Sequence, residues 1–229
     1  MPILPRRFAK LKKILNYRLT DLTIMVENVH KPHNLSALIR SCDAVGVLEA
    51  HAINGEEKHP TFNCTAKGSE KWVKLRTHEN IKKGISYLKK NGFKIYGTNV
   101  DNNSIDYRDC NFTEPTAFVL GAEKWGLSEE AKKMMDQNLY IPMRGMVQSL
   151  NVSVAGGVLL FEALRQREIN GLKEGKKDII KKDIYEKILF EWAYPEVAEW
   201  CKKEGKLYPK VNDDGEIIET LPRNIRMKY

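Results

Sequence analysis

The polar residues with the clearest chemical potential lie directly before a long apolar segment. They form the run Gln148-Ser149-Leu150-Asn151, and residues 152–164 then read as a helix that is apolar on most sides. Such a helix needs cover on several faces, from the domain core and, we expect, from a second subunit. Ser149 or Asn151 can cap its N-terminus, where unpaired N–H groups and the helix dipole favour an anionic or polar ligand. Capping without any ligand is the alternative.

A second pair of polar residues lies near the start of the chain. Pro32 favours a turn before it, and Asn34 is then predicted to cap a helix that runs to about Val45. Arg40 follows Asn34 by six residues, so the two do not share a helix face. If Asn34 lies in the turn, both side chains can reach the mouth of one cleft. An ordinary surface arginine is the alternative for Arg40.

A third candidate is the turn Gly121-Ala122-Glu123-Lys124-Trp125-Gly126-Leu127-Ser128. Its two glycines permit tight turns and close approach of the backbone to a ligand, and Glu123 supplies a carboxylate. The turn lacks both the dinucleotide-binding and the phosphate-loop patterns, so nicotinamide cofactors and ATP are not favoured. Any turn between a strand and a helix can carry two glycines, so this segment alone is weak evidence.

The elements that would position these residues alternate along the chain. Strands are predicted at 22–26, 49–53, 73–77, 94–98 and 116–120 and in the short run that begins at Leu139, with helices at 34–45, 78–91 and 128–135. This alternation predicts an α/β domain with a mostly parallel sheet, in which ligands bind beyond the carboxyl ends of the strands. Thr98, Asn99, Gly121 and Met143 fall at such ends.

The net charge of +8 is concentrated at the N-terminus. Residues 1–20 hold six basic side chains and no acidic one: Arg6, Arg7, Lys10, Lys12, Lys13 and Arg18. Phe8, Leu11, Ile14 and Leu15 recur there at helical spacing, which predicts a helix with one docked face and one basic face. A basic face suits phosphate backbones. A solvated run of charge is the alternative.

Composition narrows the class of protein further. A chain of 229 residues can form one domain with terminal additions, and it has neither an apolar run long enough to span a membrane nor a signal-peptide core. Its four cysteines are far apart and form no CxxC pair, which is typical of reduced thiols in a cytoplasmic protein. No Cys/His set completes a zinc site. We therefore expect no metal and no membrane partner.

Three segments together resemble a known family. HNLSALIR (33–40), VLGAEKWGLS (119–128) and IPMRGMVQSLNVSVA (141–155) are similar to the three ordered motifs of the SpoU class of SPOUT RNA methyltransferases. The flanks 21–34, 188–200 and 206–217 resemble the tRNA guanosine-18 ribose 2′-O-methyltransferases of that class. Gly156 and Gly157 depart from the expected Ala/Ser-like residues, at up to about 1 kcal/mol each within a helix. The last dozen residues match nothing in the pattern.

The resemblance implies a deep trefoil knot in the carboxyl half of the α/β domain, which general rules of topology would exclude. It also implies a homodimer, with the helix after Asn151 in the interface, and bound S-adenosyl-L-methionine. The implied cofactor-binding residues, acting largely through the backbone, are Thr98, Asn99, Leu120, Gly121, Ile141, Met143 and Leu150. The implied catalytic residues are Asn34, Arg40, Glu123, Ser149 and Asn151.

In this family the arginine that matches Arg40 is proposed to activate the ribose hydroxyl. Because guanidinium stays protonated in proteins, we favour a clamp that bridges the 3′-phosphate and the 2′-oxygen, with the phosphate taking the proton. Asn34, Ser149 and Asn151 would orient Arg40 and the ribose, and Glu123 would neutralise the basic cluster. Holding the reactants together supplies much of the acceleration.

We therefore predict a dimeric, cytoplasmic tRNA ribose 2′-O-methyltransferase that acts at guanosine 18. Its expected parts are a basic helical arm (1–20), the knotted domain (21–171) and a helical extension (172–229), where 184–190 and 197–201 are predicted helices. The predicted tRNA-binding residues are Arg6, Arg7, Lys10, Lys13, Arg165 and Arg167; compensation of a helix dipole is the alternative for the last two. The alternative functions are ribosomal RNA ribose methylation and catalytically silent RNA binding.

Overall fold

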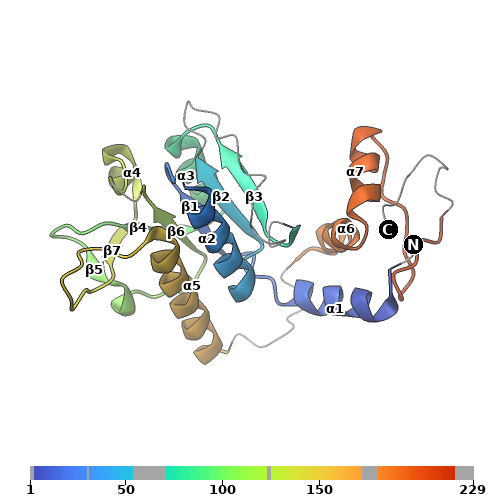
Figure 1. The fold of residues 1–229 in the computed structure, drawn as a ribbon, viewed down its shortest axis with the longest axis horizontal. Coiled ribbons are helices and arrows are strands. Elements are labelled where there is room, and N and C mark those ends of the chain that lie inside the picture. The colour runs from blue at the N-terminus through green and yellow to red at the C-terminus, as the bar shows by residue number, and fades with distance from the viewer. Residues whose placement is uncertain (1–2, 30, 54–70, 123–124, 172–179, 220–229) are drawn as a thin grey trace. The chain divides into compact units, whose positions relative to one another are not determined.

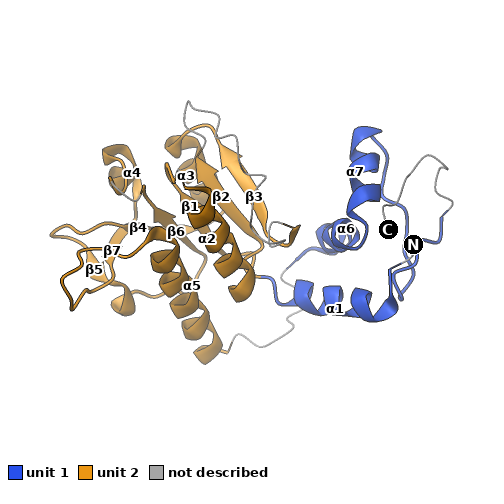
Figure 2. Cartoon of the chain, viewed as in Figure 1, with its two compact units in different colours: residues 1–18, 174–229 blue, residues 19–173 orange. Residues whose placement is uncertain are grey.

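The computed structural model (Figure 1) describes residues 3–29, 31–53, 71–122, 125–171 and 180–219. The chain divides into two compact units (Figure 2): residues 19–173 form one, and residues 1–18 together with 174–229 form the other. The basic arm and the C-terminal extension, predicted as separate additions, therefore belong to a single unit. Each unit is described by itself below.

The larger unit contains a seven-stranded sheet in which all paired strands are parallel. Its order is β3 (Lys74–His78), β2 (Glu49–Ile53), β1 (Leu22–Val26), β6 (Thr116–Leu120), β4 (Lys94–Thr98), β7 (Gln137–Tyr140) and β5 (Ile105–Asp106). The prediction of an α/β fold with a mostly parallel sheet is confirmed. The trefoil knot stays a prediction that rests on family resemblance.

The two central strands explain why the sheet is covered on both faces. β1 and β6 are buried along their whole length and pair from Leu22 with Thr116 to Val26 with Leu120. Ile24 and Phe118 contribute to one hydrophobic cluster, whereas Met25 and Val119 contribute to another. Because successive side chains of a strand point to opposite faces, a continuous apolar run requires apolar layers above and below the sheet.

Helices supply those two layers, giving the three-layer arrangement seen in Figure 1. α2 (Pro32–Val45) and α5 (Val152–Ile169) place Leu38, Leu159 and Leu160 in the first cluster. α3 (Ile81–Lys90) and α4 (Glu129–Met134) place Ile85 and Ala131 in the second. A short 3₁₀ helix, η2 (Tyr107–Asp109), follows β5.

Gly156 allows α5 to lie close to both α2 and the sheet. A Cβ atom at this position would overlap Leu38 Cδ1 and lie 3.0 Å from Leu120 Cδ1. At Gly157 the nearest such atom is Ser41 Oγ at 3.6 Å, which is ordinary contact. Packing against Leu38 and Leu120 thus explains why glycine stands at position 156. At position 157 there is room for a larger side chain, so packing does not require glycine there.

Several predicted helix ends are shifted, among them those of α2, α3 and α4. α2 begins at Pro32 with Lys31 as its N-cap, so Asn34 lies within the first turn and is not the cap. Proline is well suited to the first helical position because its fixed φ is already helical and it lacks an N–H that would go unpaired. α3 begins at Ile81, three residues later than predicted, where Asn80 accepts from Lys83 N at 2.9 Å. α4 ends at Met134.

The smaller unit packs α1 (Pro5–Asn16) with α6 (Lys182–Ala193) and α7 (Pro195–Lys203). Phe8, Leu11 and Leu15 are buried, as the predicted docked face of the arm requires. Tyr194 in this unit donates its hydroxyl hydrogen to Gly215 O at 2.7 Å. Arg18 is only 1% exposed and lies over the Trp192 ring, with 5.3 Å between Cζ and the ring centroid, so it is not part of the basic face.

Candidate active site

The site is built at the carboxyl ends of three adjacent strands, β6, β4 and β7. Gly97 pairs with Val119, and Thr98 pairs with Leu139, so these ends meet at one edge of the sheet. Thr98 Oγ1 donates to Val119 O at 3.3 Å, and Asn99 N donates to Leu139 O at 3.1 Å. The predicted cofactor-binding residues at strand ends therefore lie on neighbouring strands.

The turn after β6 offers a ligand its backbone. Ala122 N donates to Gly126 O at 3.1 Å and Gly126 N donates to Ala122 O at 2.8 Å, while Gly126 has a φ of 67°. A Cβ atom at Gly121 would overlap the backbone of Gly126, so only glycine fits there. Leu120 is 1% exposed, which leaves only its main chain for a ligand. Glu123, a predicted catalytic residue, lies outside the described residues.

Ile141, Met143 and Leu150 complete the predicted cofactor-binding set. All three are half-buried and lie in the segment between β7 and α5. Ile141 also packs against the first hydrophobic cluster. The segment thus begins anchored in the core and becomes exposed from Arg144 to Ser149, close to the start of α5.

A buried carboxylate that sequence reasoning did not select connects β1 with this turn. Glu27 is 4% exposed and its N–H donates to Leu120 O at 2.8 Å. Its carboxylate accepts from Ser128 N at 2.8 Å and from Ser128 Oγ at 2.6 Å. Ser128 Oγ also accepts from Ala131 N at 3.1 Å and so caps α4 as predicted. An acidic residue directly after a strand whose residues are apolar except for Thr23 was the available signal.

A second missed carboxylate holds the loop after β4. Asp101 accepts from Asn103 N at 2.8 Å, from Asn99 Nδ2 at 2.7 Å and from Asn138 Nδ2 at 2.9 Å. These hydrogen bonds, led by that from the Asn103 main chain, lower the pKa of Asp101 below its ordinary value. Asp101 therefore fixes the Asn99 side chain beside the end of β7.

The catalytic candidates Asn34 and Asn151 meet although 117 residues separate them. Asn151 Nδ2 donates to Asn34 Oδ1 at 3.1 Å, and Asn34 is 3% exposed. Asn151 is also the N-cap of α5, because its Oδ1 accepts from Ser153 N at 2.9 Å and from Ser153 Oγ at 2.6 Å. Since the oxygen accepts these two bonds, the amide nitrogen must be the group that faces Asn34.

Arg40 lies on the exposed side of α2, whereas Asn34 is buried on the same helix. In the part of the chain that the structure describes, no hydrogen bond or ion pair engages the Arg40 guanidinium. Ser149 is exposed immediately before α5. The structure thus joins two of the five catalytic candidates, Asn34 and Asn151, by a direct hydrogen bond.

The basic residues predicted to bind RNA divide into two groups. Arg6, Arg7, Lys10 and Lys13 are exposed on α1, and the Arg165 side chain is 58% exposed beside Glu162. Arg167 is buried, 4% exposed, and donates to Phe112 O at 2.9 Å, to Glu114 O at 2.8 Å and to the Asp21 carboxylate at 2.5 Å. It joins the end of α5 to the chain before β1 and β6. These acceptors occupy its donors, which favours a structural role for Arg167 over the predicted RNA contact.

Among the described residues, no group of three or more His, Cys, Asp or Glu side chains could hold a metal ion. No described helix is long and apolar enough to cross a membrane. Cys42, Cys110 and Cys201 are buried free thiols, and Cys64 lies outside the described residues.

Comparison with known proteins agrees with this geometry. Residues 21–161 match the model of the SpoU rRNA Methylase family, and residues 165–220 match the model described as SpoU, rRNA methylase, C-terminal. A Thermus thermophilus protein named tRNA (guanosine(18)-2'-O)-methyltransferase is 50% identical over 186 residues, covering 81% of this chain and 95% of that protein.

Solved structures show the same relationship. The A. aeolicus TrmH/SpoU tRNA modifying enzyme superposes with a TM-score of 0.76 at 39% identity, covering 84% of this chain and 97% of that one. AviRb from Streptomyces viridochromogenes, a SpoU methyltransferase solved in complex with the cofactor AdoMet, gives a TM-score of 0.58 at 26% identity, covering 66% and 58%. The chain belongs to the SpoU methylase family.

Proposed function

We propose that this protein transfers a methyl group from S-adenosylmethionine to a ribose 2′-hydroxyl of tRNA, at guanosine 18. The observation that carries the proposal is the Asn34–Asn151 hydrogen bond, which joins the first and third family motifs at the start of α5. The guanosine-18 assignment rests on the name of the T. thermophilus relative, of which 95% is covered.

The residues at the strand ends fit the cofactor. Gly121 leaves room for no side chain, so the turn presents main-chain groups beside the ends of β4 and β7. Thr98, Asn99, Leu120, Gly121, Ile141, Met143 and Leu150 would hold S-adenosylmethionine there, largely through the backbone. When bound, it supplies an electrophilic methyl group on a sulfonium centre.

The side chains would then position the ribose. Arg40 clamps the 3′-phosphate and the 2′-oxygen, and the phosphate accepts the hydroxyl proton. Asn34 and Asn151 hold each other in one orientation, and together with Ser149 they orient the ribose and Arg40. Glu123 neutralises part of the basic cluster. Much of the acceleration comes from holding the reacting groups at short distance and correct angle.

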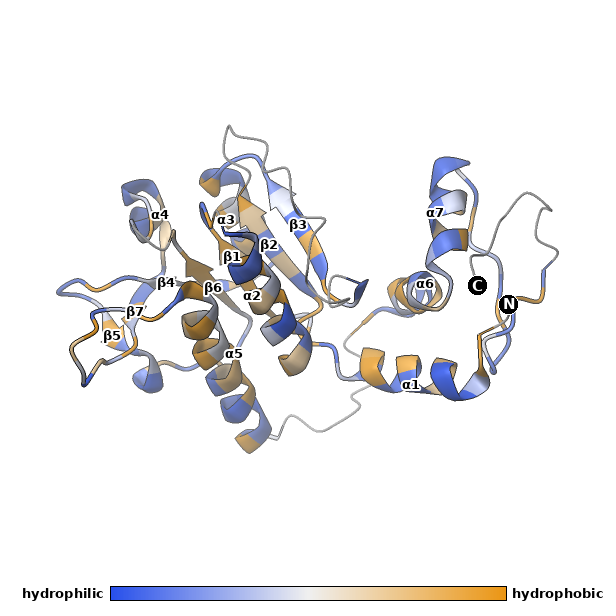
Figure 3. Ribbon diagram, in the orientation of Figure 1, coloured by the Kyte–Doolittle hydropathy of each residue, from blue (hydrophilic) through white to orange (hydrophobic). Residues whose placement is uncertain are grey.

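We also propose a homodimer formed through α5. Figure 3 shows hydrophobic colouring in the first turns of this helix and hydrophilic colouring towards its end. Val154 and Phe161 are 50% and 52% exposed and lie seven residues apart, hence on one face. Exposed apolar groups on one helix face favour cover by a second copy. A cytoplasmic location follows from the proposed substrate.

The test is methyl transfer from labelled S-adenosylmethionine to unmodified tRNA transcripts and, in parallel, to ribosomal RNA fragments, followed by mapping of the labelled nucleotide. Label on the ribose of guanosine 18 is expected. Label only on ribosomal RNA would mean that ribosomal RNA is the substrate instead of tRNA, while the proposed methyl transfer to ribose would stand. If tRNA binds but neither RNA is labelled, the protein is a silent RNA-binding member of the family.

A further inference from the structure

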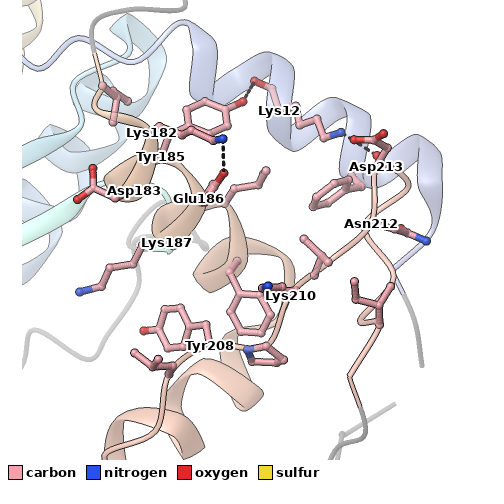
Figure 4. Close-up of a pocket in the computed structure, with 18 of the residues that line it drawn as sticks. Lys12, Lys182, Asp183, Tyr185, Glu186, Lys187, Tyr208, Lys210, Asn212 and Asp213 are labelled. Carbon is pink, nitrogen blue, oxygen red and sulfur yellow. Dashed lines mark hydrogen bonds and ion pairs between the residues drawn. The ribbon is translucent and has the colours of Figure 1, made fainter.

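A groove of about 1620 Å³ lies within the smaller unit (Figure 4). It is lined by one side of α1, by α6 and by the segment that follows α7, including Phe8, Lys12, Tyr185, Tyr208 and Lys210. The exposed arginines and lysines of α1 that were predicted to contact RNA, Arg6, Arg7, Lys10 and Lys13, do not line it. The groove is therefore a surface separate from the basic face of the arm.

The side chains around the groove carry excess positive charge. Its lining contains seven lysines, Lys12, Lys181, Lys182, Lys187, Lys202, Lys206 and Lys210, against three acidic residues, Asp183, Glu186 and Asp213. Lys182 lies 3.8 Å from Glu186, and Lys202 lies 2.9 Å from Glu191. Lys181, Lys187 and Lys210 are exposed and form no ion pair with any residue that the structure describes. The groove thus suits a polyanion.

The groove also contains a fixed aromatic ring. Tyr208 is half-buried and stacks on Phe190 with 4.9 Å between ring centroids and 20° between planes. Its hydroxyl donates to Glu191 Oε1 at 2.6 Å, which prevents rotation of the ring out of this position. Leu207, beside it, is 94% exposed. A ring that is already ordered loses little entropy when a planar group stacks on it.

We propose that this groove binds RNA, with unpaired bases stacked on Tyr208 and phosphates held by Lys181, Lys187 and Lys210. Lysines beside an ordered aromatic ring are the combination that single-stranded RNA requires, since every base has a stackable face and every nucleotide a phosphate. An acidic peptide or an anionic membrane would use the lysines but not the fixed ring. The inference rests on the proposed RNA substrate and adds a second contact surface to it.

The first test removes two groove lysines from the full-length protein. Lys187→Ala/Lys210→Ala should weaken tRNA binding about tenfold or more at low salt and lower the slope of log K against log salt by about 1.4, because each phosphate contact with a single strand contributes about 0.7. Lys90→Ala/Lys203→Ala, an equal loss of charge outside the groove, should leave both quantities unchanged. If the two double variants weaken tRNA binding equally, the proposal is overturned. It is also overturned if Lys187→Ala/Lys210→Ala binds tRNA like the parent protein but no longer binds anionic vesicles.

The second test separates stacking from charge. Tyr208→Leu should weaken binding of tRNA and of a single-stranded oligoribonucleotide about tenfold, in line with measured base–aromatic stacking, and should spare a duplex of the same length. Tyr208→Phe keeps the ring and its stack on Phe190 but loses the bond to Glu191, so it should bind RNA more weakly than the parent protein and more tightly than Tyr208→Leu. Circular dichroism and the unfolding midpoint verify that both variants are folded. A loss that is equal for duplex and single strand removes stacking from the proposal.

Both tests include methyl transfer by the parent protein at saturating tRNA. If the parent protein neither binds nor methylates tRNA, the proposed function fails. If it does both and the groove variants behave like the controls, only the groove proposal fails.

Discussion

The amide nitrogen of Asn151 lies 3.1 Å from Oδ1 of Asn34, and this bond links the N-terminus of α5 to the first turn of α2. Asn151 therefore makes two contacts: its side-chain oxygen caps α5, and its side-chain nitrogen donates to the buried Asn34 amide. A substitution can separate the two contacts, because serine caps a helix as well as asparagine does but is too short to donate to Asn34.

Asn151→Ser and Asn151→Ala both lose the bond to buried Asn34, but only Asn151→Ala also loses the cap, so its free energy of unfolding should be about 1 kcal/mol lower than that of Asn151→Ser. Turnover should fall strongly in both variants because both lose the bond to Asn34. Denaturant unfolding and single-turnover methyl transfer measure the two effects. Full activity of Asn151→Ser would show that Asn151 is only a cap.

Arg40 is exposed and has no described hydrogen-bond partner, so its removal should cost little stability. Arg40→Ala should abolish turnover while the unfolding midpoint and cofactor binding stay near the parent values. Arg40→Lys keeps the charge but lacks the planar fork, and we expect it to remain far below parent turnover. Equal turnover of Arg40→Lys and the parent would mean that charge alone is needed.

The sequence predicted the central strands well because their burial is continuous. Leu22–Val26 and Thr116–Leu120 are mainly apolar at successive positions, and they are buried on both faces. A continuous apolar run of this length is the sequence pattern typical of a buried parallel strand. The start of α2 was predicted two residues late because Asn34 has the chemistry of a cap. In the structure Pro32 occupies the first helical position and Asn34 is used for a contact with distant Asn151.

Other features depend on partners that are remote in sequence. Arg167 donates to the main-chain carbonyls of Glu114 and Phe112, which lie 53 and 55 residues away in the chain. The sequence around Arg167 contains no pattern that predicts these contacts. Glu27 is bonded to Ser128, 101 residues later, so its role becomes visible only when β1 and β6 are paired. Residue type indicated which side chains have the chemistry to bind a ligand or take part in catalysis. Burial and hydrogen bonding within the fold decide which of them a ligand can reach.

Arg165 and Arg167 lie on the same helix, but Arg165 is exposed and Arg167 is buried, so substituting each tests the contribution of burial. Arg167→Met should lower the free energy of unfolding by about 1–3 kcal/mol, because it leaves the main-chain carbonyls of Phe112 and Glu114 without their donor. The ion pair itself adds little, since the Asp21 side chain is 39% exposed. Arg165→Ala, which breaks an exposed pair with Glu162, should cost about 0.5 kcal/mol or less. Denaturant unfolding tests both values. Similar losses in the two variants would contradict the assignment of Arg167 as a structural residue.

The two adjacent glycines of α5 should respond in opposite directions to alanine. Gly156→Ala forces a methyl group against Leu38 and should destabilise the fold by about 1–3 kcal/mol. Gly157→Ala meets only ordinary contacts and should stabilise the helix by about 0.5–1 kcal/mol. Thermal unfolding at fixed protein concentration distinguishes them. Destabilisation by Gly157→Ala would indicate that the proposed dimer interface needs a close approach there.

His51 should make stability depend on pH. It is 3% exposed, and burial lowers its pKa from 6.5 to about 4, with Glu49 opposing this shift and His78, Arg76 and Lys74 adding to it. Above pH 6.5 the residue is neutral in both the folded and the unfolded chain, so it contributes no pH dependence. Between pH 6.5 and about 4 only the unfolded chain takes up the proton, which costs up to about 3 kcal/mol of stability.

The measurement is the free energy of unfolding from pH 7.5 to pH 4, in the parent protein and in His51→Phe. Phenylalanine keeps a ring beside His78 and Tyr87, whose ring centroids lie 5.2 Å and 5.7 Å from that of His51. It cannot be protonated, so its curve should fall less steeply below pH 6.5. Carboxylates that are not coupled to His51, which means those other than Glu49, contribute equally to both curves and cancel in the difference. Parallel curves would mean that His51 gains its proton in the folded protein near the ordinary pH.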